Sequence, residues 1–280
     1  MTNCRVCNSK IKPFMTFGKM PIANGFLTSD QILSEYFFEL APAFCSECGM
    51  FQLIDQPAAE KMFHENYAFF SSTSKHMQKH FKAFANYIMD SHFKNREAPF
   101  VVELGSNDGI MLRNFKEENV KHLGVEPSVN VADVAREQGI ETISEFFNLE
   151  LAKRIVDEYG NADAVLSANV MCHIPDINSV AEGIAYLLKD DGVLVFEDPY
   201  LGDVITKTSY DQIYDEHVFV FSATSVSAAF GRHGLELIDL LPQVTHGGSM
   251  RYVLAPKGSH KVSENVSVIF DKEQEQGLDK

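Results

Sequence analysis

The amino-acid sequence predicts an α/β protein in which a small metal-binding module precedes a mostly parallel sheet. Two observations support this expectation. Between residues 100 and 199, segments with strand character alternate with amphipathic segments, the pattern of a parallel sheet with helices on both faces. Ahead of this region, two Cys-x-x-Cys pairs lie close to the start of the chain. A chain of 280 residues can bury the core of one large domain beside a small one.

Composition and charge argue against two classes of partner. The chain carries 24 basic and 39 acidic residues, a formal net charge of −15, and its basic residues do not cluster. Such a surface repels the phosphates of nucleic acids. The polar start "MTNCRVCNSK" lacks the apolar stretch of a signal peptide, and no apolar run reaches the length of a membrane span. We therefore expect a cytoplasmic protein that binds neither nucleic acid nor membrane.

The two cysteine pairs predict a structural zinc site in a module that spans residues 1–60. Cys4 and Cys7 form the first pair, and Cys45 and Cys48 form the second. Each pair can turn two thiolates toward one point, which suits tetrahedral zinc. A redox-active pair or unpaired buried thiols are the alternatives, but redox chemistry usually uses a single pair. The stretch "GKMPIANGFL" between the pairs is expected to loop out.

Residues 61–99 are predicted to form a helical linker or lid. Apolar residues recur at helical spacing at Met77, Phe81, Phe84 and Ile88. The residues at 72–74 offer an N-cap for this helix. The aromatic and polar stretch "NYAFFSSTS" precedes it and is either a lid or a packed loop.

The central domain is predicted to span residues 100–258. Strand-like and amphipathic segments alternate along it, so strands and helices are expected to alternate. In such parallel sheets, ligands bind at the carboxyl ends of the strands. The expected strands cover residues 100–104, 122–125, 141–144, 162–168 and 193–199, with a late antiparallel pair at 235–241 and 250–255. The first expected helix ends near residue 117, and the later ones cover residues 129–139, 149–160 and 177–192.

The turn after the first central strand, "ELGSNDG", predicts the ligand. Gly105 and Gly109 let the backbone of the turn, which includes Asn107, approach a bound molecule. Glu103 would repel a pyrophosphate, so a dinucleotide is disfavoured, but it suits a cationic amine. Glu126 ends the second strand, where a carboxylate can accept both ribose hydroxyls. A nucleoside that carries an amino acid fits both features, which predicts S-adenosylmethionine. The alternative is a plain tight turn without a ligand.

Several motifs together resemble one enzyme family. The cysteine pairs, "VVELGSNDG", "GVEPS", "SANVMCHIPD", "FEDPYL", "YDQIYDEHVFVFS" and "THGGSMRYV" resemble the C-methyltransferases that act on nucleotide-linked deoxysugars. The match spans nearly the whole chain. It implies a Rossmann-like class I methyltransferase sheet, an N-terminal zinc module and a nucleotide-sugar substrate. Family members carry a further C-terminal domain, whereas this chain stops at "EQEQGLDK". Residues 259–280 are therefore expected to begin a C-terminal domain that is missing here.

The stretch "IYDEH" offers the groups that methylation of a sugar carbon requires. A base must remove a proton beside a ketone, and a donor must stabilise the enolate oxygen. His217 is the best base because imidazole titrates near neutral pH. Glu216 can orient it, and Tyr214 can donate to the oxygen. The resemblance implies catalytic roles for all three, whereas without it an exposed turn with a local charge pair is the simpler interpretation.

Residues at the end of the fourth strand complete the predicted site. His173 follows that strand, and a capping role is the alternative to catalysis from its position alone. Asn169 is expected to contact the cofactor, and Cys172 to be a small packed residue. The resemblance implies a catalytic role on the substrate side for Tyr67.

The glycine-containing stretch "THGGSMRYV" lies between the two late strands. His246 and Arg251 are expected to meet the phosphates of the substrate. The alternative is a hairpin loop with a structural arginine.

The leading functional hypothesis is an S-adenosylmethionine-dependent C-methyltransferase that acts on a nucleotide-linked keto-deoxysugar. An O- or N-methyltransferase on a related sugar is the runner-up, with His217 deprotonating a hydroxyl or amine. A non-catalytic binding module is a third hypothesis, and it predicts no cofactor binding. The sequence predicts neither the identity of the sugar nor the oligomeric state.

Overall fold

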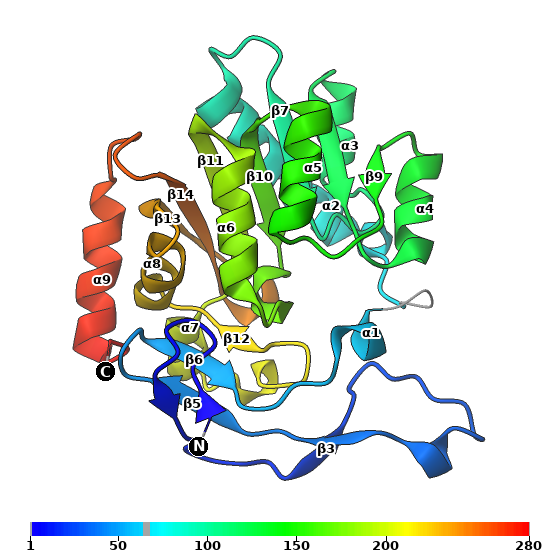
Figure 1. The fold of residues 1–280 in the computed structure, drawn as a ribbon, viewed down its shortest axis with the longest axis vertical. Helices are drawn as coiled ribbons and strands as arrows, with labels where there is room; N and C mark the ends of the chain where they lie inside the picture. Colours follow the sequence, from blue (N-terminus) through cyan, green and yellow to red (C-terminus); the bar gives the residue numbers. More distant parts are fainter. Residues whose placement is uncertain (1, 64–67, 280) are drawn as a thin grey trace.

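The computed structural model describes residues 2–63 and 68–279 and is organised around a seven-stranded sheet (Figure 1). The strand order is β13-β14-β11-β10-β7-β8-β9. The strands are β7 (Phe100–Leu104), β8 (Lys121–Val125), β9 (Thr142–Ile143), β10 (Ala162–Ala168), β11 (Leu188–Pro199), β13 (Leu235–Gln243) and β14 (Ser249–Pro256).

The strand directions confirm the predicted alternation. Strands β7 to β11 run parallel, whereas β14 pairs antiparallel with both β11 and β13. The late antiparallel pair therefore lies at one edge of the sheet, as expected. One boundary differs: the predicted helix over 177–192 ends at Leu187, and β11 begins at Leu188. The charged "KDD" stretch that follows Leu188 belongs to the start of the strand rather than the end of a helix, and it lies at an irregularity in the pairing with β10 between Leu188 and Val193.

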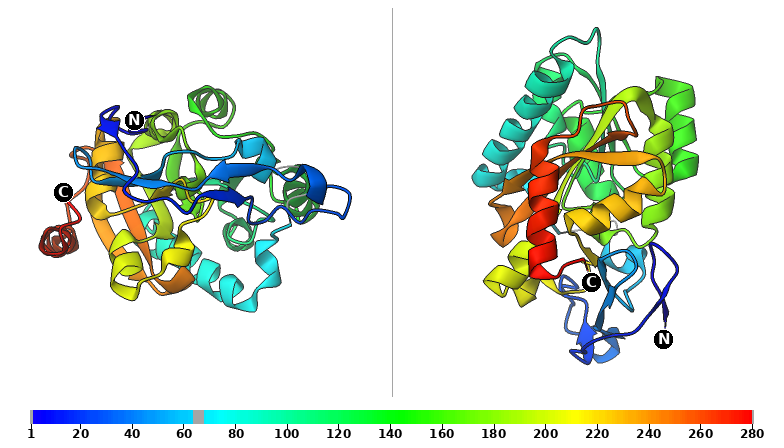
Figure 2. Two further views of the ribbon diagram at one scale, coloured as in Figure 1. Left: turned by 90° about the horizontal axis from the view of Figure 1, so that it is seen from below. Right: turned by 90° about the vertical axis from the view of Figure 1, so that its left-hand side faces the viewer.

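Helices cover both faces of the sheet, because alternate strand residues face opposite sides. The six helices of these two layers are α2 (Lys75–Ile88), α3 (Leu112–Glu117), α4 (Val129–Glu137), α5 (Leu149–Tyr159), α6 (Ile177–Leu187) and α8 (Ala223–Gly231). On β7, Val101 packs in the core with residues of α2, α3 and α4, whereas Val102 packs in the core with residues of α5, α6 and α8. Figure 2 shows α2 on the opposite side of the sheet from α6.

Helix α2 is part of the core rather than a linker. Its N-cap is Ser74, whose side chain accepts a hydrogen bond from the Met77 backbone N–H. This matches the predicted cap. Phe84 and Ile88 are fully buried against the sheet. The predicted linker over residues 61–99 therefore contains a helix that is packed into one layer of the large domain.

The N-terminal module contains only short strands, and a strand from the large domain joins it. The strands are β1 (Thr2–Asn3), β2 (Lys10–Ile11), β3 (Lys19–Pro21), β4 (Phe37–Glu39), β5 (Pro42–Cys45) and β6 (Met50–Leu53). The short helix α1 (Ala59–Met62) follows them. Strand β12 (Phe219–Val220) pairs antiparallel with β6, which gives a three-stranded sheet in the order β12-β6-β5. The two regions are thus joined by backbone hydrogen bonds.

The C-terminal helix belongs to the large domain. Helix α9 (Glu264–Gln276) packs against β13 and α8 and ends at Gly277, which has a left-handed conformation. Its buried Glu273 accepts hydrogen bonds from the N–H groups of Ala223 and Thr224, at the start of α8. A carboxylate at a helix N-terminus is favourable. This helix, which lies beyond the expected domain limit at residue 258, therefore packs against elements of the large domain.

Helix α7 (Leu201–Lys207) follows β11 directly and leads toward the loop before β12. Among residues 2–63 and 68–279, no helix is both long enough and apolar enough to cross a membrane.

Candidate functional site

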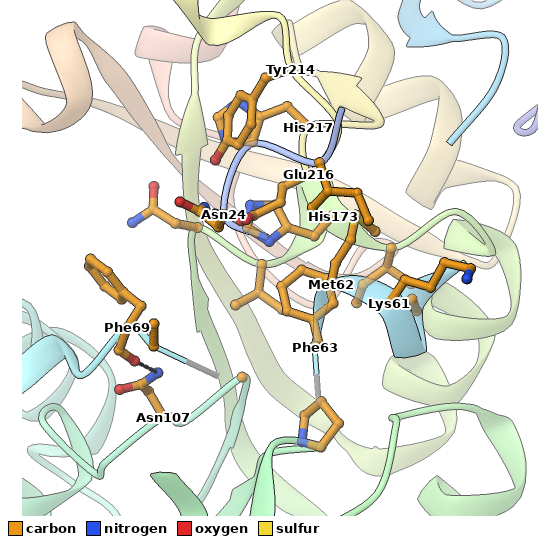
Figure 3. A pocket seen from close by; sticks show the side chains of 18 of the residues that line it. Asn24, Lys61, Met62, Phe63, Phe69, Asn107, His173, Tyr214, Glu216 and His217 are labelled. Carbon is orange, nitrogen blue, oxygen red and sulfur yellow. Dashed lines mark hydrogen bonds between the residues drawn. The ribbon is translucent and has the colours of Figure 1, made fainter. Parts of the chain in front are cut away.

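A cavity of about 1080 Å³ lies at the carboxyl ends of β7, β8 and β10 (Figure 3). Its walls include four regions that are distant in sequence. The strand ends form one part, and an N-terminal segment over residues 22–36, here called the arm, forms another. The loop over 212–217 and residues 59–63 with α1 add two more, and further residues, among them His246 and those just before α2, line the rest. The cavity is therefore shared by the N-terminal module and the large domain.

The glycine turn after β7 forms the floor of the cavity. Gly105 has a φ of +68°, and a Cβ there would overlap the side chain of Val170. Only glycine fits this position, because the backbone is left-handed and the space is occupied. Gly109 has a φ of +77° and faces Ile140 instead of the cavity. The structure thus places Gly105 on the ligand side of the turn and Gly109 on its packed side.

Glu126 is the buried carboxylate that faces the cavity. Its Oε2 accepts a hydrogen bond from the Asn107 N–H at 3.0 Å, and its Oε1 accepts one from the Ser128 N–H at 2.8 Å. Burial raises the pKa of Glu126, and these two hydrogen bonds oppose that shift. A carboxylate has about four acceptor positions, so acceptor capacity remains for the hydroxyls of a ribose. The geometry fits the predicted cofactor.

Glu103 lies behind the turn rather than in the cavity. Its side chain is buried, and it does not belong to the cavity wall. Burial raises the pKa of Glu103 well above its usual range, with a further rise from the nearby Glu126 and Asp108. The expected direct contact with a cofactor amine is therefore not supported by its position.

The segment before α2 is fixed on the glycine turn. The Asn107 side chain donates to the Phe69 carbonyl at 3.0 Å and accepts from the Ser71 N–H at 2.9 Å. Asp108 accepts a hydrogen bond from the Ser72 N–H at 3.0 Å. Figure 3 shows Phe69 and Asn107 joined in this way. The segment thus covers one end of the cavity, while the predicted Tyr67 lies outside the described residues.

Asn169 lies at the end of β10, on the cavity wall. It has a left-handed φ of 56°, and its N–H donates to the Glu197 carbonyl at 2.7 Å. Asparagine tolerates this conformation better than most residues. The structure brings Asn169 to the same cavity as Gly105 and Glu126, in agreement with the strand-end argument.

His217 is held in one tautomer at the other end of the cavity. Its Nδ1–H donates to the Gln212 carbonyl at 2.9 Å, which leaves Nε2 as the acceptor. Burial lowers the pKa of His217 to about 4, with a further lowering from the nearby His246. The imidazole is therefore neutral near pH 7. The ring of Tyr214 lies 4.4 Å from the His217 ring, centroid to centroid.

His173 contacts His217 from the end of the neighbouring strand. The two ring centroids are 5.2 Å apart, and the Phe63 ring stacks on His173 at 5.5 Å. Burial and the nearby His217 lower the pKa of His173 well below its usual range. Among the described residues, its Nε2 has no hydrogen-bond partner. Cys172 is fully buried and the pKa of its thiol is raised by burial, as expected for a packed residue.

Glu216 is held by a residue that the sequence argument did not identify. Asn24 of the arm donates from its Nδ2 to Glu216 Oε1 at 2.6 Å. Burial raises the pKa of Glu216, and the hydrogen bonds from Asn24 and Tyr214 lower it. Asn24 lies in "GKMPIANGFL", which was expected to loop out. Its Asn-Gly pair gave a turn signal, but no signal of a contact with residue 216.

The two residues predicted to meet substrate phosphates have different surroundings. His246 lines the cavity, in a left-handed conformation with a φ of 51°. Arg251 is buried, forms an ion pair with Glu197 at 2.5 Å and lies over the Phe84 ring at 3.9 Å. His80 contacts the second oxygen of Glu197 at 2.6 Å. Arg251 does not belong to the cavity wall, and its guanidinium is engaged by Glu197 and the Phe84 ring.

The four predicted zinc ligands come together. Their sulfur atoms all lie within 4.8 Å of one another, with Cys4 and Cys48 at 3.6 Å and Cys7 and Cys45 at 3.4 Å. Tetrahedral zinc with bonds of about 2.3 Å holds its sulfurs about 3.8 Å apart. The Gln52 side chain donates to Cys4 Sγ at 3.0 Å, as in the supporting shell of a metal site. The four residues therefore fit zinc.

Comparison with known families identifies both regions. Residues 73–240 match the family described as "Methyltransferase domain", and residues 4–63 match the family described as "Putative zinc binding domain". The chain belongs to this methyltransferase family. Its large domain has a Rossmann-like class I methyltransferase fold and is preceded by a zinc-binding domain.

One curated relative is similar over nearly the whole chain. The C-methyltransferase NovU of Streptomyces niveus is 31% identical over 278 residues. The match covers 98% of this chain and 66% of NovU. The chain thus spans just under two thirds of the length of this relative.

Solved structures agree on the fold. The magnesium protoporphyrin IX methyltransferase of Synechocystis has a TM-score of 0.50 at 13% identity, over 63% of this chain and 82% of that one. The PH0226 protein of Pyrococcus horikoshii has a TM-score of 0.51 at 15% identity, over 68% and 95%. At such identities the similarity concerns the fold alone.

Proposed function

We propose that the protein transfers a methyl group to a carbon of a nucleotide-linked keto-deoxysugar. The observation that carries this proposal is the meeting of two sets of residues in one cavity. Glu126, Gly105 and Asn169 line its cofactor end, and the pair His173 and His217 lies at the other end. The 31% identity to a C-methyltransferase supports carbon rather than oxygen or nitrogen as the acceptor.

His217 is the base in the proposed reaction. Its Nε2 carries a free lone pair, because Nδ1 donates to the Gln212 carbonyl. It removes the proton from the sugar carbon beside the ketone, and the electron pair of that C–H bond forms the enolate. S-adenosylmethionine, when bound, supplies an electrophilic methyl group. With the cofactor bound, the enolate carbon would form the new C–C bond as the methyl C–S bond breaks, with the electron pair of that bond left on sulfur.

Tyr214 and Glu216 control the charge near the enolate. The Tyr214 hydroxyl is suited to donate to the enolate oxygen, since the ring lies directly against His217. In the resting site the Tyr214 O–H donates to the carboxylate of Glu216. Because a phenol has one proton to donate, this O–H turns from Glu216 to the enolate oxygen as negative charge develops there. His173 packs against His217 and keeps its ring in place. His246, on the same cavity wall, is proposed to meet the phosphates of the substrate.

Solvent-deuterium exchange tests the proposal. The full-length gene product is incubated in D₂O with a thymidine-diphosphate-linked keto-deoxyglucose and no cofactor. Deuterium should enter at the carbon beside the ketone, and methylation at the same carbon should follow when S-adenosylmethionine is added. An O- or N-methylated product without deuterium at carbon would overturn the proposal. So would the absence of cofactor binding in calorimetry.

A further inference from the structure

The arm of the N-terminal module contacts the loop that carries Glu216 and His217. The Asn24 side chain donates to Glu216 Oε1 at 2.6 Å, and the Ala23 N–H donates to Asp215 Oδ1 at 3.1 Å. These partners are 192 residues apart in sequence. Two adjacent residues of the arm therefore hold two adjacent residues of the loop. Figure 3 shows Asn24 beside Glu216 at the catalytic end of the cavity.

Other contacts fix the same loop from the same module. The Gln56 side chain donates to the carbonyls of Asp215 and His173, each at 3.3 Å. The Leu53 N–H donates to the Val218 carbonyl at 2.8 Å, just before β12 joins β6. The backbone of the loop thus has several supports. Among the described residues of the module, Asn24 is the one whose side chain donates to the Glu216 carboxylate.

The chemistry of Asn24 suits a positioning role. Glu216 is buried. The ionisable groups that interact with it include Asp215 and Tyr214 on its own loop and the buried Cys172. An amide donor orients such a carboxylate without adding a charge that would change the titration of these groups. Asn24 also belongs to the cavity wall, so it is close to any sugar bound there.

We propose that Asn24 is a positioning residue for methyl transfer, which fixes the Glu216 carboxylate and through it the Tyr214 hydroxyl. This inference rests on the proposed function for the roles of Glu216 and Tyr214. The zinc-binding domain thereby contributes a side chain to the reaction that takes place in the large domain. Neither the family matches nor the sequence motifs assign a role to Asn24.

Hydrogen exchange tests the contact without any substrate. In Asn24→Ala, backbone amides of residues 213–218 should exchange faster than in the wild type, because the loop loses a side-chain support. Asn86→Ala is the matched control, since Asn86 is exposed on α2 and lies away from the cavity. Unchanged exchange in the loop of Asn24→Ala would overturn the positioning role. A general loss of protection in both variants would overturn it as well, because the effect would not be local.

A double-mutant cycle tests the action through Glu216. With the keto-sugar probe, Asn24→Ala should lower kcat by about 10- to 100-fold, the range expected for a small misplacement of a reacting group. Affinity for S-adenosylmethionine should stay within about 2-fold. In a Glu216→Gln background, the same substitution should cost less than about 3-fold, because its target is already lost. Equal costs in both backgrounds would overturn the proposal.

The charge variant Asn24→Asp adds a readout that a purely structural role would not move. An ionised carboxylate at residue 24 repels Glu216, so kcat relative to the wild type should be lowest at neutral pH and should rise as the pH falls. A ratio that does not vary with pH would contradict the proposal. If the wild type neither exchanges nor methylates the probe, the proposed function fails, and hydrogen exchange alone decides whether Asn24 positions the loop.

Discussion

The two ends of the cavity are built in different ways. At the cofactor end, Gly105, Glu126 and Asn169 directly follow strands β7, β8 and β10 of one sheet. At the catalytic end, His217 and Glu216 lie on a loop that is held by Asn24 of the arm. The first end depends on the topology of a single sheet, and the second depends on contacts between two domains.

This difference separates site residues whose positions follow from the local sequence pattern from site residues whose positions depend on contacts distant in sequence. Parallel strands bring their carboxyl ends to one edge wherever the alternation of strands and helices is regular. No such topological rule places the catalytic loop. Its position depends on hydrogen bonds between residues that are 192 apart in sequence. We therefore expect changes at the cofactor end to affect binding alone, and changes at the catalytic end to affect turnover alone.

The largest effect is expected for His217→Asn. Turnover should fall by roughly 10²- to 10⁴-fold, the usual contribution of a general base, with affinity for S-adenosylmethionine unchanged. Deuterium exchange at the sugar carbon should fall with methyl transfer, because both require the enolate. His76→Asn, at an exposed position on α2, is the control. If exchange persists in His217→Asn and is lost in His173→Asn, then His173 is the base.

Glu126→Ala should have a smaller effect, and it should weaken cofactor binding rather than lower turnover. Affinity for S-adenosylmethionine should weaken by about 1–3 kcal/mol, the cost of losing a charge-assisted hydrogen bond. Turnover at saturating cofactor should change little. Calorimetric titration measures the effect, with Glu137→Ala on the exposed face of α4 as the control. Equal affinity in wild type and Glu126→Ala would show that Glu126 does not hold the ribose.

Loss of zinc should lower turnover and leave cofactor affinity nearly unchanged, as expected for changes at the catalytic end of the cavity. Elemental analysis of the purified protein should give one zinc per chain. In Cys45→Ser, zinc should be lost and methyl transfer should fall, because the metal stabilises the module and the module holds the loop over 213–218. Cofactor affinity should stay within about 3-fold. A zinc content near zero in wild type, with free thiols and an intact fold, would contradict the assignment of the metal site.

The last comparison concerns stability and pH. Burial lowers the pKa of His217 from 6.5 to about 4, so between these values the unfolded chain binds a proton that the native protein does not. Stability contributed by this group is therefore lost as the pH falls from 6.5 toward 4, by up to about 1.4 kcal/mol per pH unit. Buried carboxyls such as Asp198, with a pKa of about 8, act in the opposite direction.

The comparison with His217→Asn isolates this contribution. The difference in unfolding free energy between wild type and variant should shrink as the pH is lowered through this window. Urea denaturation at a series of pH values measures it. A difference that is independent of pH would mean that the native imidazole titrates normally.

Most of the fold could be predicted because its signals are local. The alternation from residue 100 to 199, the Ser74 cap and the cysteine pairs each depend on a few neighbouring residues. The boundaries that differ have other causes. Leu188 continues directly from helix to strand without a glycine or proline to separate them. The C-terminal helix was expected to begin a new domain, but Glu273 ties it to the start of α8.

The site was predictable only in part. Glu126 and Asn169 reach the cavity because they end strands, and His173 and His217 meet there as the motif match implied. Arg251 follows the same kind of motif, yet it pairs with Glu197 on the neighbouring strand, a partner that one sequence does not identify. Asn24 was missed for the same reason, since no periodicity links a turn in the zinc-binding domain to residue 216.

The pairing of β12 with β6 has a consequence for synthesis on the ribosome. The cysteine ligands and β6 emerge early, whereas Phe219, which pairs with Gln52, emerges only after most of the sheet domain has been made. At about 5–20 residues per second, this leaves an interval on the order of ten seconds. During it, one edge of β6 presents unpaired N–H and C=O groups, the kind of edge that recruits foreign strands. During this interval, residues 50–53 of the nascent chain are therefore open to mispairing and to capture by chaperones.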